Sequence, residues 1–260
     1  MAETPRIAAV VLAAGAGTRL RPLTLLRPKA LCPVGNVALV DCAIARARTI
    51  TDAVAVNVHH GRDQMLEHLG DRVHVSIEEG EALGTAGALG YLRDWIDGRD
   101  VLVMNADAWH DAPVEEFVAG WERTDPRLWV VPDAEHRDFG DRRFTGTSLL
   151  PWSGVATLPA TPAGLYEVCF REREAAGRLE LVDSPGPYFD CGTVAEYHAA
   201  NMAASNGENV VGERAVVEGE IVRTVVWPDS TVRADERLVD AVRAGTATTV
   251  YANEGGTRGR

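Results

Sequence analysis

Short apolar runs alternate with helical patterns along the first half of the chain. Residues 6–13 (Arg-Ile-Ala-Ala-Val-Val-Leu-Ala) are almost entirely apolar and are followed by a glycine-rich stretch, which is typical of a buried parallel strand. The same pattern predicts further strands and helices, at 53–58, 73–77 and 101–104 for the strands and at 39–50, 61–69, 85–96 and 114–123 for the helices. This alternation predicts an α/β fold with a largely parallel sheet.

The pattern changes in the second half of the chain. Strand signals become irregular, at 138–141 and 145–150, and helices are predicted at 165–176 and 194–204. After Gly207, short valine-rich pieces separated by Gly, Asp or Pro indicate the turns of a hexapeptide-type β-helix. Such a tail has about two turns, fewer than a stable solenoid needs, so we expect it to pack on the main domain or on a second copy of itself.

The length of 260 residues suits one large domain with a small appendage. We predict a catalytic domain over residues 1–207, a β-helix-like tail over 208–250 and a disordered end over 251–260. Homodimerisation through the tail is the expected form of self-association.

Charge and composition exclude several classes of protein. The formal net charge of −12 argues against a duplex-DNA binder, which needs a basic face. The apolar runs are far shorter than the roughly 20 residues of a transmembrane helix, and the first residues lack the features of a signal peptide. We therefore expect a cytoplasmic protein that binds neither nucleic acid nor membrane. The four cysteines show no metal-binding spacing, which predicts buried or half-buried thiols in a reducing compartment.

A glycine-rich loop directly follows the first predicted strand. Glycines at such a position let several backbone N–H groups approach one anion, but a bare Gly-x-Gly is a weak signal. Cations lie close behind it in the sequence, at Arg19, Arg21, Arg27 and Lys29, and Lys29 is the only lysine of the chain. Asp107 follows the strand at 101–104. Because ligands bind beyond the carboxyl ends of parallel strands, the loop and Asp107 are expected at one edge of the sheet.

Two motifs sharpen this interpretation. Residues 15–24 read Gly-Ala-Gly-Thr-Arg-Leu-Arg-Pro-Leu-Thr, and residues 28–34 read Pro-Lys-Ala-Leu-Cys-Pro-Val. They resemble the signature of the sugar-1-phosphate nucleotidyltransferases, G-x-G-T-R-L-x-P-L-T followed by P-K-x-L-x-P-V. Residues 83–89, 105–107 and 189–193 resemble later segments of the same family, in the same order, and the valine-rich tail resembles that of its mannose-1-phosphate guanylyltransferase branch.

The resemblance implies a fold and an activity. The fold would be a Rossmann-like, mostly parallel sheet flanked by helices, of the glycosyltransferase-A-like type, with a short left-handed β-helix-like tail. The activity would join an NTP to a sugar 1-phosphate, or to a related cyclitol phosphate, and release an NDP-sugar and pyrophosphate. Mg²⁺ would be the cofactor.

The resemblance also implies a role for particular residues. Arg19 and Lys29 would be catalytic, and Asp107 and Asp190 would hold the metal. Asn105 and Gly146 would contact the sugar. The nucleotide would be bound by two segments, with Leu12, Ala13, Ala14, Gly15, Gly17 and Thr18 on the triphosphate and Gly84, Thr85 and Gly87 on the base and ribose.

The donor, the acceptor and two rival functions stay open. GTP is the favoured donor, with UTP or dTTP behind it. Many relatives bind the sugar phosphate with a second lysine that this chain lacks, so we expect Arg142 or Arg143 to replace it. A regulatory subunit that binds nucleotide sugars without turnover is one alternative. A phosphocholine-type cytidylyltransferase is the other, and it would need an aromatic cage.

Overall fold

The computed structural model describes residues 7–253, and the chain divides into two compact units. Among the described residues, the first unit comprises residues 7–15, Val40–Ala106 and Asp111–Gly186. The second comprises Ala16–Leu39, Asp107–His110 and residues 187–253. The chain therefore crosses between the units inside the glycine-rich loop and again directly before Asp107.

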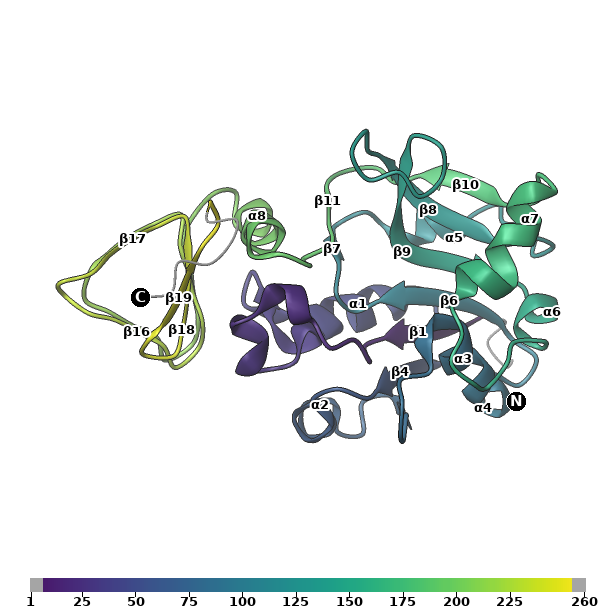
Figure 1. The fold of residues 1–260 in the computed structure, drawn as a ribbon, viewed down its shortest axis with the longest axis horizontal. Coiled ribbons are helices and arrows are strands. Elements are labelled where there is room, and N and C mark those ends of the chain that lie inside the picture. Colours follow the sequence, from purple (N-terminus) through teal and green to yellow (C-terminus); the bar gives the residue numbers. More distant parts are fainter. Residues whose placement is uncertain (1–6, 254–260) are drawn as a thin grey trace. The chain divides into compact units, whose positions relative to one another are not determined.

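A seven-stranded sheet forms the centre of the first unit, in the order β10-β8-β9-β6-β1-β4-β5 (Figure 1). Its strands are β1 (Ile7–Leu12), β4 (Val54–Val58), β5 (His74–Ile77), β6 (Asp100–Asn105), β8 (Arg127–Pro132), β9 (Arg142–Leu150) and β10 (Glu180–Asp183). All pairings are parallel except those of β9, which runs antiparallel to both β6 and β8. The predicted mostly parallel sheet is confirmed.

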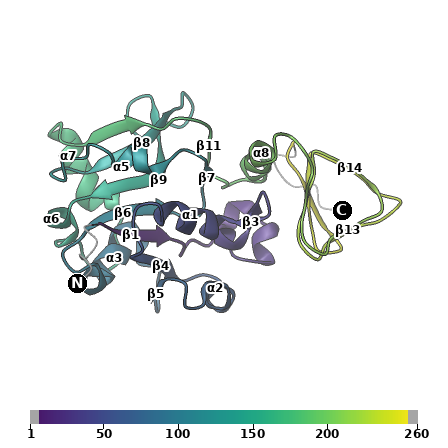
Figure 2. The same cartoon turned by 180° about the vertical axis from the view of Figure 1, so that it is seen from behind.

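Helices cover both faces of this sheet (Figures 1 and 2). They are α1 (Leu39–Ala47), α2 (Arg62–Leu69), α3 (Gly84–Tyr91), α4 (Arg93–Ile96), α5 (Val114–Val118), α6 (Trp152–Val155), the π-helical turn Tyr166–Phe170 and α7 (Arg171–Ala175). On one face, Leu128 and Val130 pack in a cluster with Leu89 of α3 and Ile96 of α4. On the other face, Trp129 stacks on Phe117 of α5 at 4.8 Å between ring centroids.

Several predicted boundaries were wrong. The helix predicted at 85–96 is interrupted at Leu92, and the one predicted at 114–123 ends at Val118, two residues before Gly120 takes a left-handed φ of 68°. The strand predicted at 138–141 is a loop that makes only an isolated bridge between Phe139 and Arg142. That loop begins at Asp133. The Asp133 carboxylate accepts hydrogen bonds from the backbone N–H groups of residues 135 and 136, which turns the chain. The preceding strand, β8, was not predicted.

The second unit begins with three short 3₁₀ turns, over Thr18–Leu20, Leu23–Leu25 and Lys29–Leu31. Two small antiparallel pairs follow, β2 (Pro33–Val34) with β3 (Val37–Ala38) and β7 (Trp109–His110) with β11 (Tyr188–Phe189). Helix α8 (Val194–Ala204) follows, as predicted, and Thr193 caps its first turn by accepting the N–H of Glu196.

A parallel coil completes the second unit and confirms the predicted β-helix-like tail (Figure 1). Its strands are β12 (Val210–Val211), β13 (Val216–Val217), β14 (Glu220–Val222), β15 (Val225–Val226), β16 (Thr231–Val232), β17 (Arg237–Val239), β18 (Ala241–Ala244) and β19 (Thr248–Tyr251). Each of β12, β13 and β14 pairs in parallel with the strand three places later, which is the repeat of a three-sided coil. The predicted disordered end at 251–260 overlaps β19 at Tyr251, and residues 254–260 lie outside the described residues.

Left-handed corners and ion pairs shape this coil. Arg214, Arg223, Asp229 and Asp240 all have φ between 46° and 58°. Arg214 forms two hydrogen bonds to the Asp229 carboxylate, at 2.6 and 2.8 Å, and Arg223 pairs with Asp240 in the same way along the coil. These ion pairs thus link corners of successive turns of the coil.

Among residues 7–253, no helix has the length and apolar character needed to cross a membrane.

Candidate active site

The single lysine of the chain is buried in the second unit between two carboxylates. The Lys29 Nζ lies 3.0 Å from Asp107 Oδ2, 3.8 Å from Asp190 Oδ1 and 3.0 Å from the Asp190 carbonyl oxygen. Only 6% of the Lys29 side chain is exposed, whereas 41% of the Asp107 side chain is. The structure therefore brings three of the predicted site residues together, and Asp107 presents its carboxylate to solvent.

Gly17 explains how Lys29 is held. Gly17 has a φ of 59°, and a Cβ atom there would lie 2.8 Å from Lys29 Cβ and 3.1 Å from Thr24 Cγ2. The Thr24 hydroxyl donates a hydrogen bond to the Gly17 carbonyl at 2.9 Å. The lysine stem therefore packs directly on the backbone of the glycine-rich loop, and only glycine fits this position.

Arg19 joins the same group of charges. Its Nη2 lies 3.2 Å from Asp190 Oδ2, and the Arg19 side chain is mostly exposed. A Cβ atom on Gly192 would lie 2.7 Å from both of these atoms. Glycine at 192 thus leaves room for the Arg19–Asp190 pair. Cys191 lies between Asp190 and Gly192 in the sequence. Its burial raises the pKa of its thiol, so it is a neutral packing group here.

The two aspartates have the chemistry of a site for a hard cation. Oxygen ligands from one or two carboxylates, completed by phosphate oxygens and water, are what Mg²⁺ prefers. Among residues 7–253 no cluster of three or more His, Cys, Asp or Glu side chains is arranged for a metal. Asp107 and Asp190 would supply carboxylate oxygens to such an ion.

A hydrogen-bonded network in the first unit holds the start of the glycine-rich loop, and the sequence did not predict it. The Ala13 N–H donates to Asn57 Oδ1 at 2.7 Å, and Asn57 Nδ2 donates to Glu78 Oε1 at 2.7 Å. The other oxygen of Glu78 accepts the N–H of Leu83 at 2.8 Å. The loop and the segment before Gly84 are thus connected through two buried polar side chains. The signal in the sequence was Asn57 itself, a polar residue inside an otherwise apolar strand.

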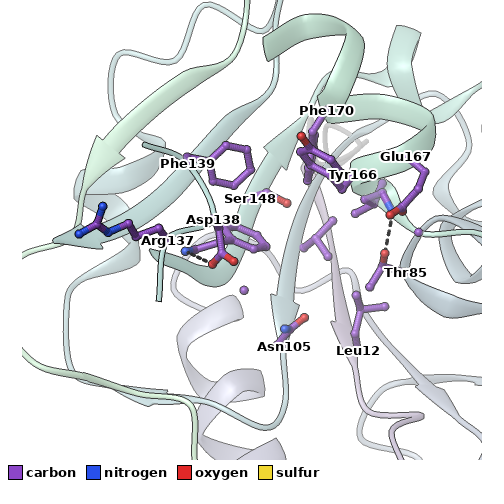
Figure 3. A pocket seen from close by; sticks show the side chains of 15 residues that line it. Leu12, Thr85, Asn105, Arg137, Asp138, Phe139, Ser148, Tyr166, Glu167 and Phe170 are labelled. Atoms are coloured by element: carbon purple, nitrogen blue, oxygen red, sulfur yellow. Dashed lines mark hydrogen bonds between the residues drawn. The ribbon is translucent and has the colours of Figure 1, made fainter. Parts of the chain in front are cut away.

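Four predicted residues line one cavity of about 560 Å³ in the first unit (Figure 3). They are Leu12 at the end of β1, Thr85 in α3, Asn105 at the end of β6 and Gly146 in β9. Gly146 has a φ of 78°, and a Cβ atom there would lie within 2.8 Å of the Asn105 side chain. Glycine at 146 therefore lets Asn105 reach its place in the cavity wall.

Other predicted residues have different surroundings. A Cβ atom on Gly87 would lie 2.4 Å from the Thr161 carbonyl oxygen, and one on Gly84 would lie 2.7 Å from that of Ala163. These glycines allow α3 to pack closely on a neighbouring segment, and neither lines the cavity. Ala14 and Gly15 stand in the partly exposed loop, where the Ala14 carbonyl lies 2.9 Å from His60 Nδ1. Thr18 is exposed in the first turn of the second unit.

Arg142 and Arg143, which are expected to replace the missing lysine, each lie near carboxylates. Arg142 pairs with Asp183 at 2.8 Å and with Asp141 at 3.0 Å, and this holds the pKa of the Asp183 carboxyl below its usual value. Arg143 lies 3.7 Å from Asp133. Neither arginine lines the cavity, where the arginine present is Arg137.

Comparison with known proteins identifies the class. The family description "Nucleotidyl transferase" matches residues 8–147, more than half of the chain. An N-acetylmuramate alpha-1-phosphate uridylyltransferase of Caulobacter vibrioides is 37% identical over 60% of this chain and 69% of its own length. Mannose-1-phosphate guanylyltransferase 1 of Arabidopsis thaliana is 33% identical over 73% of this chain and 62% of its own length.

A solved structure supports the same fold. A Thermus thermophilus protein described as a mannose-1-phosphate geranyltransferase superimposes with a TM-score of 0.69 and 17% identity, over 95% of this chain and 96% of that one. The family match over residues 8–147 shows that the chain belongs to the nucleotidyl transferase family. Within that family it is one of the sugar-1-phosphate nucleotidyltransferases, which are enzymes of nucleotide-sugar biosynthesis.

Proposed function

We propose that this protein transfers a nucleotidyl group from an NTP to a sugar 1-phosphate, or to a related cyclitol phosphate, and releases pyrophosphate. The observation that carries the proposal is the buried Lys29 between Asp107 and Asp190, with Arg19 bound to the same Asp190. A cluster of cations and carboxylates next to a glycine-rich loop suits the handling of phosphate groups.

The proposed reaction needs no general base from the protein. The attacking oxygen belongs to a phosphate monoester, whose second pKa is about 6, so it is anionic near neutral pH without a general base. The barrier comes from the approach of two anions and from the charge that builds on the leaving pyrophosphate. Catalysis is then mainly a matter of position and electrostatics.

We assign the residues accordingly. Arg19 neutralises the leaving pyrophosphate, and Lys29 binds the phosphate that is attacked or the phosphate that attacks. The backbone from Leu12 to Thr18 binds the triphosphate. Gly84, Thr85 and Gly87 contact the base and ribose, and Asn105 and Gly146 contact the sugar.

Asp107 and Asp190 would hold Mg²⁺. When bound, the ion would neutralise phosphate charge and help to orient the phosphate groups. The exposed Asp107 carboxylate and its contact with Lys29 support this assignment, because both groups would face the same phosphates.

The names of two relatives indicate different donors, since one is a guanylyltransferase of Arabidopsis thaliana and the other a uridylyltransferase of Caulobacter vibrioides. We propose GTP as the donor of this protein, with UTP or dTTP as the competing donors. We also propose that residues 1–207, the predicted catalytic domain, carry all of the catalytic residues, and that the coil that follows supports a homodimer.

The test is a matrix of five NTPs against a panel of sugar 1-phosphates with Mg²⁺, with the products identified by mass. Asp107→Asn should lower turnover about a hundredfold, because it removes the charge that binds the metal and faces Lys29. Asp235→Asn, which removes an exposed ion-paired carboxylate of the coil, is the matched control.

Two results would contradict the proposal. Nucleotide binding without turnover of any acceptor would favour the regulatory subunit. Full activity of the Asp107→Asn enzyme, with or without EDTA, would remove the metal assignment.

A further inference from the structure

The glycines of α3 let a second segment of the first unit lie directly against the helix. Gly84 and Gly87 meet the carbonyl groups of the segment 159–163, as described above, and a Cβ atom on Gly90 would collide with the Pro159 carbonyl oxygen. Successive members of this set are three residues apart and are therefore neighbours on the helix surface. The helix and the segment thus touch backbone to backbone over the length of α3.

Hydrogen bonds join the same two segments at the start of α3. The Ala163 N–H donates to the Leu83 carbonyl at 3.0 Å, and the Ala163 carbonyl accepts the Ala86 N–H at 3.0 Å. The Leu165 N–H donates to Thr85 Oγ1 at 2.8 Å (Figure 3). Thr85 therefore contributes the side-chain bond, while the other two bonds join backbone groups.

The joined segment continues into one wall of the cavity. The residues of this wall, which we call the 164–170 wall, are Gly164, Leu165, Tyr166, Glu167 and Phe170. Its backbone forms the π-helical turn Tyr166–Phe170, a rare conformation that occurs mostly at functional sites. Thr85, Asn105 and Gly146 line the same cavity. The predicted nucleotide segment and the predicted sugar residues thus share one cavity, and Thr85 is bonded to its wall.

From these contacts we infer that Thr85 is a positioning residue that couples the binding of the two substrates, an inference that rests on the proposed function. A nucleotide that binds at Gly84–Gly87 fixes the start of α3. Because Thr85 and the backbone of α3 hold the 164–170 wall, the same event fixes the wall. The sugar 1-phosphate then binds to a wall that is already in place, so the donor strengthens the binding of the acceptor.

Hydrogen–deuterium exchange of residues 164–170 tests the link directly. The donor is the α,β-methylene analogue of the best NTP, with Mg²⁺, which binds but cannot release pyrophosphate. In the parent and in Thr85→Ser, which keeps the hydroxyl, the analogue should slow exchange in the wall. In Thr85→Val, which keeps the shape but leaves the Leu165 N–H without its acceptor, this protection should fall by about fivefold or more.

Calorimetry measures the coupling itself. The Kd of the best sugar 1-phosphate is determined with and without saturating analogue, and the ratio of the two values is compared among variants. Repulsion between the two anionic ligands is the same in every variant, so a change in this ratio reports the part played by the protein. Thr85→Val should lower the ratio by about fivefold or more, and Thr85→Ser by less than about twofold.

Thr157→Val is the matched control. The Thr157 hydroxyl also bonds to a backbone group, since it donates to the Gly154 carbonyl at 3.2 Å, but Thr157 does not line the cavity. This variant should keep both the protection and the Kd ratio of the parent. Melting temperatures of all variants, compared with that of the parent, would separate a change in coupling from a change in folding.

Gly90→Ala separates positioning from a direct contact with a ligand. Gly90 is buried near the end of α3 and does not line the cavity, but a side chain there would press on the Pro159 carbonyl. It should lower the Kd ratio in the same direction as Thr85→Val. A folded Gly90→Ala protein with the ratio of the parent would contradict the role given to the packing of α3.

The outcomes distinguish this inference from the proposed function. No binding of any nucleotide and no turnover of any sugar 1-phosphate would overturn the proposed function and this inference with it. Turnover by the parent, together with exchange of residues 164–170 that the analogue leaves unchanged, would overturn this inference alone. A Kd ratio in Thr85→Val equal to that of the parent would do the same.

Discussion

At the scale of single residues, the position of Lys29 depends on Gly17. Gly17→Ala would place a Cβ atom 2.8 Å from Lys29 Cβ and would also strain a backbone with a φ of 59°. We expect kcat to fall at least about tenfold, because the lysine must shift away from Asp107 and Asp190. Steady-state kinetics would measure this loss.

Gly98→Ala provides the control for this prediction. Gly98 has a φ of 80°, but a Cβ atom there would meet nothing within 4 Å. It should lower stability through backbone strain and leave kcat near that of the parent. Equal kcat values for the two variants would show that the packing of Gly17 on Lys29 has no part in catalysis.

The cysteines allow a prediction about reactivity. Burial raises the pKa of the Cys32 thiol to about 12 and that of Cys42 to about 11, and also raises that of Cys169. Since the thiolate is the reactive form, alkylation of the folded protein should be negligible near pH 8 and should increase only as the pH approaches these values. Mass spectrometry after iodoacetamide treatment checks this, with urea-unfolded protein as the control. Rapid labelling of folded Cys32 at pH 8 would contradict it.

Some residues of the candidate active site could be recognised from the sequence, and others could not. Lys29, Asp107 and Asp190 stood in recognisable motifs, and the structure brings them together. Glu78 gave no such signal, because a single polar residue after a strand can face solvent, neighbours or a ligand equally well. Its importance comes from its hydrogen bonds to Asn57 and Leu83, and the contact with Asn57 joins segments that are far apart in the sequence.

At the scale of elements, helix α8 connects the coil with the segment that contains Lys29, all within the second unit. The Tyr197 hydroxyl donates to the Pro33 carbonyl and accepts a hydrogen bond from Trp227 Nε1 at 3.0 Å. The Arg27 guanidinium lies 4.5 Å from the centroid of the Trp227 ring. Tyr197 and Trp227 are both fully buried or nearly so. Trp227 therefore supports Arg27 directly and Pro33 through Tyr197.

Trp227→Leu should disturb both contacts. It removes the N–H donor and the ring beneath Arg27, and we expect a loss of about 2–4 kcal/mol in the free energy of unfolding. It should also raise the KM for NTP, because the turns around Lys29 lose their support. Trp227→Phe should restore part of the stability, since it keeps an aromatic ring. Urea unfolding and kinetics would measure both effects.

Trp152→Leu is the matched control for this prediction. Trp152 is a partly buried tryptophan that packs against the core cluster of the first unit. Its replacement should lower stability without a comparable change in KM. If Trp227→Leu changed stability alone, its role would be that of an ordinary core residue.

The elements that were predicted well share one feature. β1 and α8 were found to within about one residue because their patterns are continuous and end in clear turn or cap residues. β8 was missed because it follows a short irregular stretch and pairs with β9 through a bulge between Leu128 and Val130. The break of α3 at Leu92 had no signal, since residues 85–96 keep a helical pattern. Tertiary packing decided these cases.

At the scale of the whole molecule, the coil is part of the core of the second unit. One buried cluster includes Leu20 and Leu23 from the first turns, Tyr197 and Ala200 from α8, and Val225, Trp227 and Val242 from the coil. The sequence predicted the coil and its need for a partner surface. It could not predict that this surface includes the turns around Lys29, because no periodic pattern connects residues 20–34 with residues 210–244.

A chain that ends at Gly207 should therefore lose more than an appendage. The truncation removes the coil's share of this cluster, including Val210, Val225 and Trp227, and exposes the apolar face of α8. Because the same cluster supports the segment with Lys29, we expect a lower melting temperature, aggregation and at least about tenfold lower turnover. A chain that ends at residue 253 keeps every residue of the cluster and controls for shortening as such. Thermal unfolding, light scattering and kinetics on the two chains would measure the difference, and light scattering of the parent would also test the proposed homodimer. A truncated chain that stays soluble, stable and active would show that residues 1–207 need no support from the coil.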